Sequence, residues 1–165
     1  MPTTLPMPIE FELPEGWRAA PPDEVGAPGA AFVALHPQPD AGFTANITID
    51  GAYRPDEATL FDIAHESVQR LSQVAASVVV ASRREIGSAD APGFTQTLAV
   101  SAIVGGVPRD LVQSQVYLSM LDVADPHERV VIRLVLTSTA SQHPAVLHDF
   151  QDFVRTVTPD SNAAS

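Results

Sequence analysis

The sequence contains no cysteine and no lysine, and its nine basic residues are all arginine, against 20 acidic residues. Without cysteine the chain forms no disulfide, no thiolate metal site and no cysteine nucleophile, so its stability must come from packing. The formal net charge of −11 disfavours nucleic acid as a partner, because an acidic surface repels a phosphate backbone. An anionic membrane is disfavoured for the same reason.

The sequence also lacks long apolar runs. No stretch approaches the length of a membrane span, so direct membrane insertion is not expected. The first residues, "MPTTLPMPIEFELPEGW", have no basic region followed by an apolar region, as a signal peptide would. As written, the sequence predicts a cytoplasmic protein. If a native signal sequence precedes these residues, the protein is instead expected to be exported.

The length and composition predict one domain. A chain of 165 residues that is 45% hydrophobic can bury a single cooperative core. Proline and polar residues are frequent at both ends, which favours loose termini. We therefore expect a loose N-terminal segment over residues 1–8, the domain over 9–157, and a disordered tail over 158–165.

Alternating or apolar segments bounded by glycine, proline and aspartate predict seven strands. They cover residues 9–13, 31–36, 43–50, 77–87, 94–104, 107–121 and 129–139. Residues 18–30 are expected to be a loop. Gly105 and Gly106 between two strands predict a tight hairpin turn, because glycine adopts the positive φ angles that such a turn needs.

Two segments have helical periodicity. The first begins at Thr59, which forms a capping-box pattern with Asp62 three residues later. Its expected apolar face consists of Leu60, Ala64, Ser67, Val68, Leu71, Val74 and Ala75. The second helix begins near Pro144, a residue suited to the first helical position. Its expected stripe consists of Val146, Phe150, Phe153, Val154 and Val157.

The order of these elements is three strands, a helix, four strands and a helix. That order does not fit an alternating parallel sheet. It predicts an α+β fold with a central, mostly antiparallel sheet of six to seven strands and two main helices, in which one face of the sheet can be apolar and the other polar.

The strands near the C-terminus suggest such a two-sided sheet. The expected apolar face carries Leu98, Val100, Val112, Val116, Leu118, Met120, Ile132, Leu134 and Leu136. The expected polar face carries Thr95, Thr97, Gln113, Gln115, Tyr117 and Arg133. We interpret Gln113, Gln115, Tyr117 and Arg133 as a candidate platform for a protein or peptide; the alternative is a solvated face, or one covered by the N-terminal segment.

Two further residues are given structural roles. Trp17 is expected to anchor its loop against the core, and Asn46 to make a local hydrogen bond.

No pattern predicts catalysis or metal binding. The histidines are not spaced as metal ligands, and His143 and His148 lie five residues apart instead of the four that align side chains on a helix. A G-x-S-x-G nucleophile motif, a phosphate loop and a G-x-G-x-x-G motif are all missing from the sequence. We therefore assign no catalytic residue, no metal ligand and no cofactor.

Four short stretches carry a resemblance to a known family. They are "FELPEGW" (residues 11–17), "GFTANITI" (42–49), "QSQVYL" (113–118) and "HDFQDFVRTV" (148–157). Together they resemble the actinobacterial LpqN-type proteins of the PsbP-like superfamily, which also includes Mog-type and DcrB-like proteins and chaperones of type VI secretion. The arginine-only, alanine-rich composition also suits an actinobacterial source.

The resemblance implies an α/β/α sandwich and a non-catalytic binding or accessory role, such as an adaptor or a secretion-associated chaperone with a protein or peptide partner. LpqN-type proteins are typically exported lipoproteins, whereas this sequence has neither a signal peptide nor a lipid-accepting cysteine. Two alternatives stay open: a small-ligand carrier or cryptic enzyme with a pocket between sheet and helix, and a self-associating structural module. The oligomeric state is expected to be monomer or homodimer.

Overall fold

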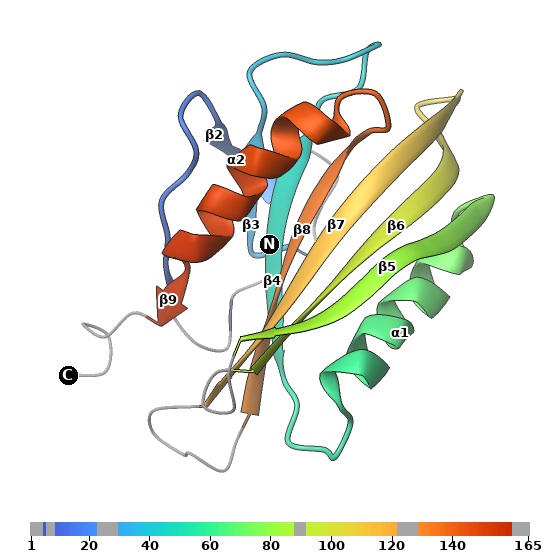
Figure 1. Cartoon of the computed structure of the whole chain (residues 1–165). Helices are drawn as coiled ribbons and strands as arrows, with labels where there is room; N and C mark the ends of the chain where they lie inside the picture. The colour runs from blue at the N-terminus through green and yellow to red at the C-terminus, as the bar shows by residue number, and fades with distance from the viewer. Residues whose placement is uncertain (1–4, 6–8, 23–29, 88–91, 122–128, 160–165) are drawn as a thin grey trace.

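The computed structural model describes residues 5, 9–22, 30–87, 92–121 and 129–159, and its main feature is a seven-stranded antiparallel sheet (Figure 1). In spatial order the strands are β2 (Arg18–Ala20), β3 (Phe32–Leu35), β4 (Asn46–Tyr53), β8 (Arg129–Thr139), β7 (Val107–Leu121), β6 (Pro92–Val104) and β5 (Ser77–Gly87). Helix α2 (His143–Thr156) lies over one face and helix α1 (Leu60–Ser72) over the other. The expected α+β sandwich is confirmed.

The long C-terminal strands follow the sequence prediction closely. Strands β5, β7 and β8 have the predicted bounds, and β6 begins two residues earlier than predicted. Gly105 and Gly106, with φ angles of 59° and 80°, form the predicted two-residue turn between β6 and β7. The three strands β6, β7 and β8 therefore form one continuous antiparallel meander with β5 at its edge.

The N-terminal strands differ from the prediction. The expected strand over 9–13 is only β1 (Ile9–Glu10), which pairs with β9 (Thr158–Pro159) outside the main sheet. Phe11 and Leu13 pack against the core without being in a strand. The segment 18–30, expected to be a loop, begins with β2. Its three residues are too few to show the alternation of apolar and polar residues that predicts a strand.

The expected ends of the domain fall largely outside the described residues. This applies to 1–4 and 6–8 of the N-terminal segment and to 160–165 of the tail. Leu5, which is described, packs against the core, and Thr158 and Pro159 belong to β9.

Helix α2 and the sheet face beneath it enclose the larger core. The buried residues that α2 contributes are Val146, Phe150 and Phe153, with Val157 directly after the helix, and Val154 is partly buried, so the predicted stripe is confirmed. The sheet contributes Ala34, Ile47, Ile49, Val116, Val130, Ile132, Leu134 and Leu136. This cluster is apolar, as expected for a core that has no disulfide to support it.

The face beneath α1 holds two smaller clusters and corrects part of the prediction. Leu98 and Val100, expected on the α2 side, form a cluster with Leu111 on the α1 side. Thr95 and Thr97, expected on the polar face, lie on the α2 side. The pairing of β6 with β7 sets these faces: Leu98 lies opposite Gln113 and Thr95 opposite Val116, so directly paired residues share a face.

The packing face of α1 is confirmed except at one position, since the structure buries or packs Leu60, Ala64, Ser67, Val68, Leu71 and Ala75. Ile63 is buried although it was not assigned to the apolar face, while Val74 lies beyond the end of the helix and is 82% exposed. The capping box at Thr59 is confirmed, since its hydroxyl accepts from the Asp62 backbone N–H and the Asp62 carboxylate accepts from the Thr59 N–H.

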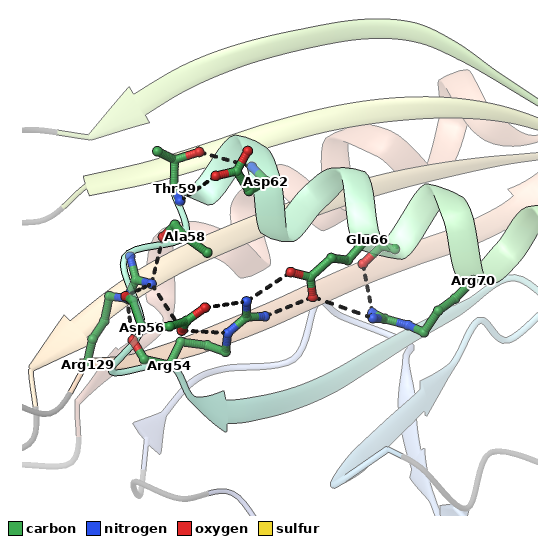
Figure 2. Close-up of polar contacts among 9 residues, drawn as sticks. Arg54, Asp56, Ala58, Thr59, Asp62, Glu66, Arg70 and Arg129 are labelled. Atoms are coloured by element: carbon green, nitrogen blue, oxygen red, sulfur yellow. Dashed lines mark hydrogen bonds and ion pairs between the residues drawn. The ribbon is translucent and has the colours of Figure 1, made fainter.

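Ionic contacts fix the start of α1 to the central strands, as Figure 2 shows. The Arg54 guanidinium donates to both carboxylate oxygens of Glu66 at 3.0 and 2.9 Å and also binds Asp56. These hydrogen bonds lower the pKa of the Glu66 and Asp56 carboxyls. Arg129, at the start of β8, donates to the backbone carbonyls of Arg54 and Ala58. The segment between β4 and α1 is thereby tied to β8.

We predict that Phe150→Ala destabilises the fold by about 3–5 kcal/mol, because its ring is 1% exposed in the larger core and its removal leaves a cavity. Urea unfolding followed by circular dichroism measures this loss. Val74→Ala is the control and should change the unfolding free energy by less than about 0.5 kcal/mol. A large effect at Val74 would mean that this side chain is buried, as the sequence predicted, and would contradict the structure.

Candidate functional site

The four residues predicted as a polar platform do share one face of the sheet. Gln113, Gln115 and Tyr117 lie on β7 and Arg133 on β8, with Tyr117 directly opposite Arg133. However, Gln115 and Tyr117 are only 2% and 1% exposed, because α1 covers this face. A partner cannot reach these two side chains while α1 is in place. Binding of a partner by the four residues stays a prediction.

A hydrogen-bond network joins this face to α1. The Tyr117 hydroxyl lies 2.7 Å from Ser67 Oγ on α1 and 2.7 Å from Gln115 Oε1. Gln96 Nε2 donates to Gln115 Oε1 and to the Ala64 carbonyl of α1. Burial raises the pKa of Tyr117, so the phenol stays protonated and remains a hydrogen-bond donor. These polar side chains satisfy one another beneath the helix.

Arg133 extends the network to the edge of α1. Its guanidinium donates to Ser67 Oγ at 3.1 Å and to Asp50 Oδ2 at 2.7 Å. The positive charge is therefore paired with a carboxylate where it is partly buried. In this structure Tyr117 and Arg133 of the predicted platform hold α1 on the sheet through Ser67, and Gln115 Nε2 donates to Gln113 Oε1 within the same network.

The two residues predicted to be structural lie on different faces of the sheet: Trp17 on the α2 side, and Asn46 on the same face as Gln113, because both pair with Thr137. Trp17 is buried in the larger core, and its indole Nε1 donates to Asp149 Oδ2 on α2 at 3.1 Å. This contact joins the loop before β2 to α2. Asn46 Nδ2 donates to the Thr44 carbonyl two residues earlier, at 3.2 Å. Both contacts hold local structure in place.

A groove lies on the α2 side, where the sheet extends beyond the helix. It encloses about 560 Å³ between α2 and the strands β5, β6 and β7. Its lining consists of Ser82, Arg83, Arg84, Ile86, Thr95, Thr97, Ser114, Val116, Leu147, Phe150, Gln151, Val154 and Arg155. The floor carries hydroxyl groups and the α2 wall is mainly apolar, so the groove is amphipathic. We take this groove as the candidate functional site.

The charge of the groove is opposite to that of the protein. Arg84 and Arg155 are among its lining residues, and none of the described aspartates or glutamates is. Arg83 borders the groove as well, but its guanidinium lies on the α1 side, where it contacts Gln96 and Phe61. The whole chain has 20 acidic and nine basic residues. Arg155 forms an ion pair with Asp152 at 2.9 Å on the solvent-exposed surface, whereas Arg84 has no hydrogen-bond or ion-pair partner among the described residues. The groove can therefore attract an anionic group.

A buried histidine supports the floor of the groove. His143 Nε2 lies 3.1 Å from the hydroxyl of Ser114, and His143 Nδ1 lies 2.9 Å from the hydroxyl of Ser138. In a neutral imidazole one nitrogen donates and the other accepts, and a hydroxyl can take either role, so both contacts can be satisfied. Burial lowers the pKa of His143 and favours this neutral form. The residue cross-links the first turn of α2 to β7 and β8.

Sequence reasoning did not find this site. Its residues come from four separate segments, and only the strand order and the placement of α2 bring them together. The one available signal was the pair Arg83 and Arg84 at the end of an otherwise apolar strand.

No group of three or more potential metal ligands occurs within the described part of the chain. None of the described helices combines the length and apolar character required to cross a membrane.

Comparison with solved structures identifies the fold. LpqN of Mycobacterium tuberculosis, which is involved in cell envelope biogenesis, is similar with a TM-score of 0.64 and 13% identity over 93% of this chain and 86% of that one. The Ran-binding protein Mog1p of Saccharomyces cerevisiae has a TM-score of 0.62 and 17% identity, covering 94% and 92%. The cyanobacterial PsbP of Synechocystis sp. PCC 6803 has a TM-score of 0.57 and 16% identity, covering 92% and 86%.

These likenesses show that the chain has the PsbP-like fold shared with Mog1p, as the resemblance in the sequence implied. At such low identities they show the fold alone. Neither a protein-family model nor a curated protein sequence matches the chain.

We predict that acidification weakens the fold through His143. Its pKa is lower in the folded protein than its ordinary value of 6.5, so the unfolded chain binds the proton more readily. The stabilisation is present above about pH 6.5 and is lost as the pH falls through 6.5 towards the folded-state pKa. Unfolding free energies at pH 7.5 and 5.5 should therefore differ more for the wild type than for His143→Gln.

The matched control for this experiment is His148→Gln, because His148 is an exposed histidine on the same helix. It should keep the pH dependence of the wild type. An equal loss of pH dependence in both variants would rule out His143 as its source.

Proposed function

We propose that this protein is a non-catalytic accessory protein that binds a segment of a protein or peptide partner in the groove between α2 and strands β5 to β7. A role as an adaptor or secretion-associated chaperone fits such binding. The structural relatives support an accessory or binding role, since Mog1p is a Ran-binding protein and LpqN takes part in cell envelope biogenesis. The partner would be met in the cytoplasm, or in the envelope if the chain is exported.

The observation that carries the proposal is the charge of the groove. Two arginines, Arg84 and Arg155, line it on the α2 side, whereas none of the described acidic residues does. A distribution so different from the rest of the protein suits an acidic segment, because the remainder of the surface repels such a segment and the groove attracts it. Electrostatic complementarity of this kind selects the partner and its orientation.

The apolar wall gives the groove a second recognition element. Leu147 and Val154 on α2 are partly buried, and Val116 lies on the floor. An acidic segment that also carries apolar side chains can bury them against this wall, while Thr95 and Thr97 line the floor with hydroxyl groups. The proposed partner segment is therefore both acidic and apolar.

A small anionic amphiphile is the second candidate. The volume of about 560 Å³ lies within the range of small-molecule sites, roughly 300–1,000 Å³. In this case the arginines would bind the anionic group and the α2 wall the apolar part. The protein would then act as a ligand carrier.

The test compares the wild type with a Gln151→Glu, Arg155→Glu variant as bait in lysate and envelope fractions of the source cells. Both positions are exposed on α2 and line the groove, so the variant should fold while its groove repels an acidic segment. We expect a specific protein to be retained by the wild type and its recovery to fall at least about tenfold with the variant, as measured by quantitative mass spectrometry.

The matched control carries Gln69→Glu and Arg70→Glu, the same substitutions at adjacent exposed positions of α1. It should retain the partner like the wild type. Equal recovery by all three baits would place binding outside the groove. A small molecule found in native mass spectra of the wild type, but not of the groove variant, would favour the ligand carrier.

A further inference from the structure

Strand β5 is a long, unpaired edge of the main sheet. The strand has 11 residues and pairs with β6 on one side except at the bulge at Ala81, and within the described ranges no strand pairs with its other side. The opposite edge of the sheet, β2, has only three residues. Proteins commonly shorten or cover their edge strands, because free N–H and C=O groups accept a further strand. The length of β5 therefore distinguishes it from β2.

The side chains along this edge are available on both faces. Val79 and Arg84 point to the α2 side, since they pair with Ala99 and Thr95 of β6, and both are exposed. Glu85, on the α1 side, is exposed as well. Neither Arg84 nor Glu85 forms a hydrogen bond or ion pair with a described residue.

Arg83, the neighbour of Arg84, is already engaged. Its Nε donates to Gln96 Oε1 at 3.0 Å, and its guanidinium lies 4.8 Å from the centroid of the Phe61 ring. The charged groups left on the β5 edge are thus one cation and one anion at adjacent positions, with an exposed valine nearby. This arrangement defines the chemistry of a complementary strand.

We propose that β5 binds an extended segment of a partner protein by antiparallel strand addition. The added strand places a basic residue opposite Glu85, an acidic residue opposite Arg84 and an apolar residue opposite Val79. Opposite charges and apolar pairs directly across two strands stabilise their pairing, and the main-chain hydrogen bonds supply affinity. The inference rests on the proposed function only in taking the partner to be a polypeptide, because it concerns the main-chain edge of β5, which adjoins the groove at Arg84.

A second copy of the chain fits this edge less well. Antiparallel pairing of two β5 strands about Arg84 would place Arg84 opposite Arg84, and pairing about Glu85 would place Glu85 opposite Glu85. Like charges directly across a strand pair are destabilising. Each chain also carries a net charge of −11, which adds repulsion between copies. The bulge between Val80 and Ser82 further disturbs a symmetric pairing.

The test uses a short synthetic peptide of threonine residues with an adjacent Lys and Glu and a Val nearer its C-terminus, added to the full chain. Amide hydrogen exchange of β5 is measured by NMR. We expect exchange of the outward-facing β5 amides to slow about threefold when the free peptide is at twice its Kd. No protection of β5 at millimolar peptide would overturn the proposal.

Two N-methylated versions of the peptide separate strand addition from simple charge attraction. One version carries methyl groups on alternate residues and the other on the intervening residues, so that only one of them loses the N–H groups facing β5. We expect that version to bind at least about tenfold more weakly than the other, as each lost hydrogen bond is worth about 1 kcal/mol. Equal affinities would overturn the proposal.

Charge exchange identifies the contact at Arg84. Arg84→Glu should weaken the peptide, and a peptide with Lys in place of its Glu should restore binding. Arg155→Glu, in the groove, should leave the affinity for this peptide unchanged. A failure of strand addition at β5 can therefore be distinguished from a failure of partner binding in the groove. If β5 becomes protected as the protein concentration rises without peptide, a second copy is the occupant and the proposal is wrong.

Discussion

The rest of the structure depends on the burial of strand β8 on both faces. This strand lies at the centre of the sheet between β4 and β7, and its successive residues Val131 and Ile132 face opposite sides and are both buried. A strand that is apolar on both faces needs a cover on each side. The chain supplies α2 for one side and α1 for the other, and this requirement produces the three-layer sandwich.

The two covers differ in chemistry. Helix α2 rests on an apolar cluster that includes Ile132 and Phe150, whereas part of α1 rests on the polar network of Gln96, Gln115 and Tyr117. Hydrogen bonds are directional, so the network specifies how α1 sits, while the apolar contact supplies most of the burial energy. The ionic contacts of Arg54 and Arg129 hold the start of α1 in the same position.

The sequence predicted the elements better than their faces. Periodicity located β5, β7, β8 and α2, because long alternating or helical stretches carry a strong signal. It assigned Leu98 to the wrong face, because hydrophobicity does not reveal pairing register in a strand that is apolar on both sides. It placed Gln115 and Tyr117 on a polar face but left open whether that face is exposed; in the structure they satisfy one another beneath α1. The groove depends on the order of the strands in the sheet, which the periodicity of the sequence does not reveal.

The same sheet therefore accounts for both candidate binding surfaces. Seven strands are wider than one helix, so α2 covers the sheet around β8 and leaves part of β5, β6 and β7 beside it as a groove. The final strand on that side, β5, pairs only with β6 among the described residues, which leaves its outer backbone groups available for pairing. Arg84 lies where the two surfaces meet, because its side chain lines the groove while its backbone belongs to the edge. On a protein with a net charge of −11, the cationic side chain of Arg84 at this place can attract an acidic group of a partner.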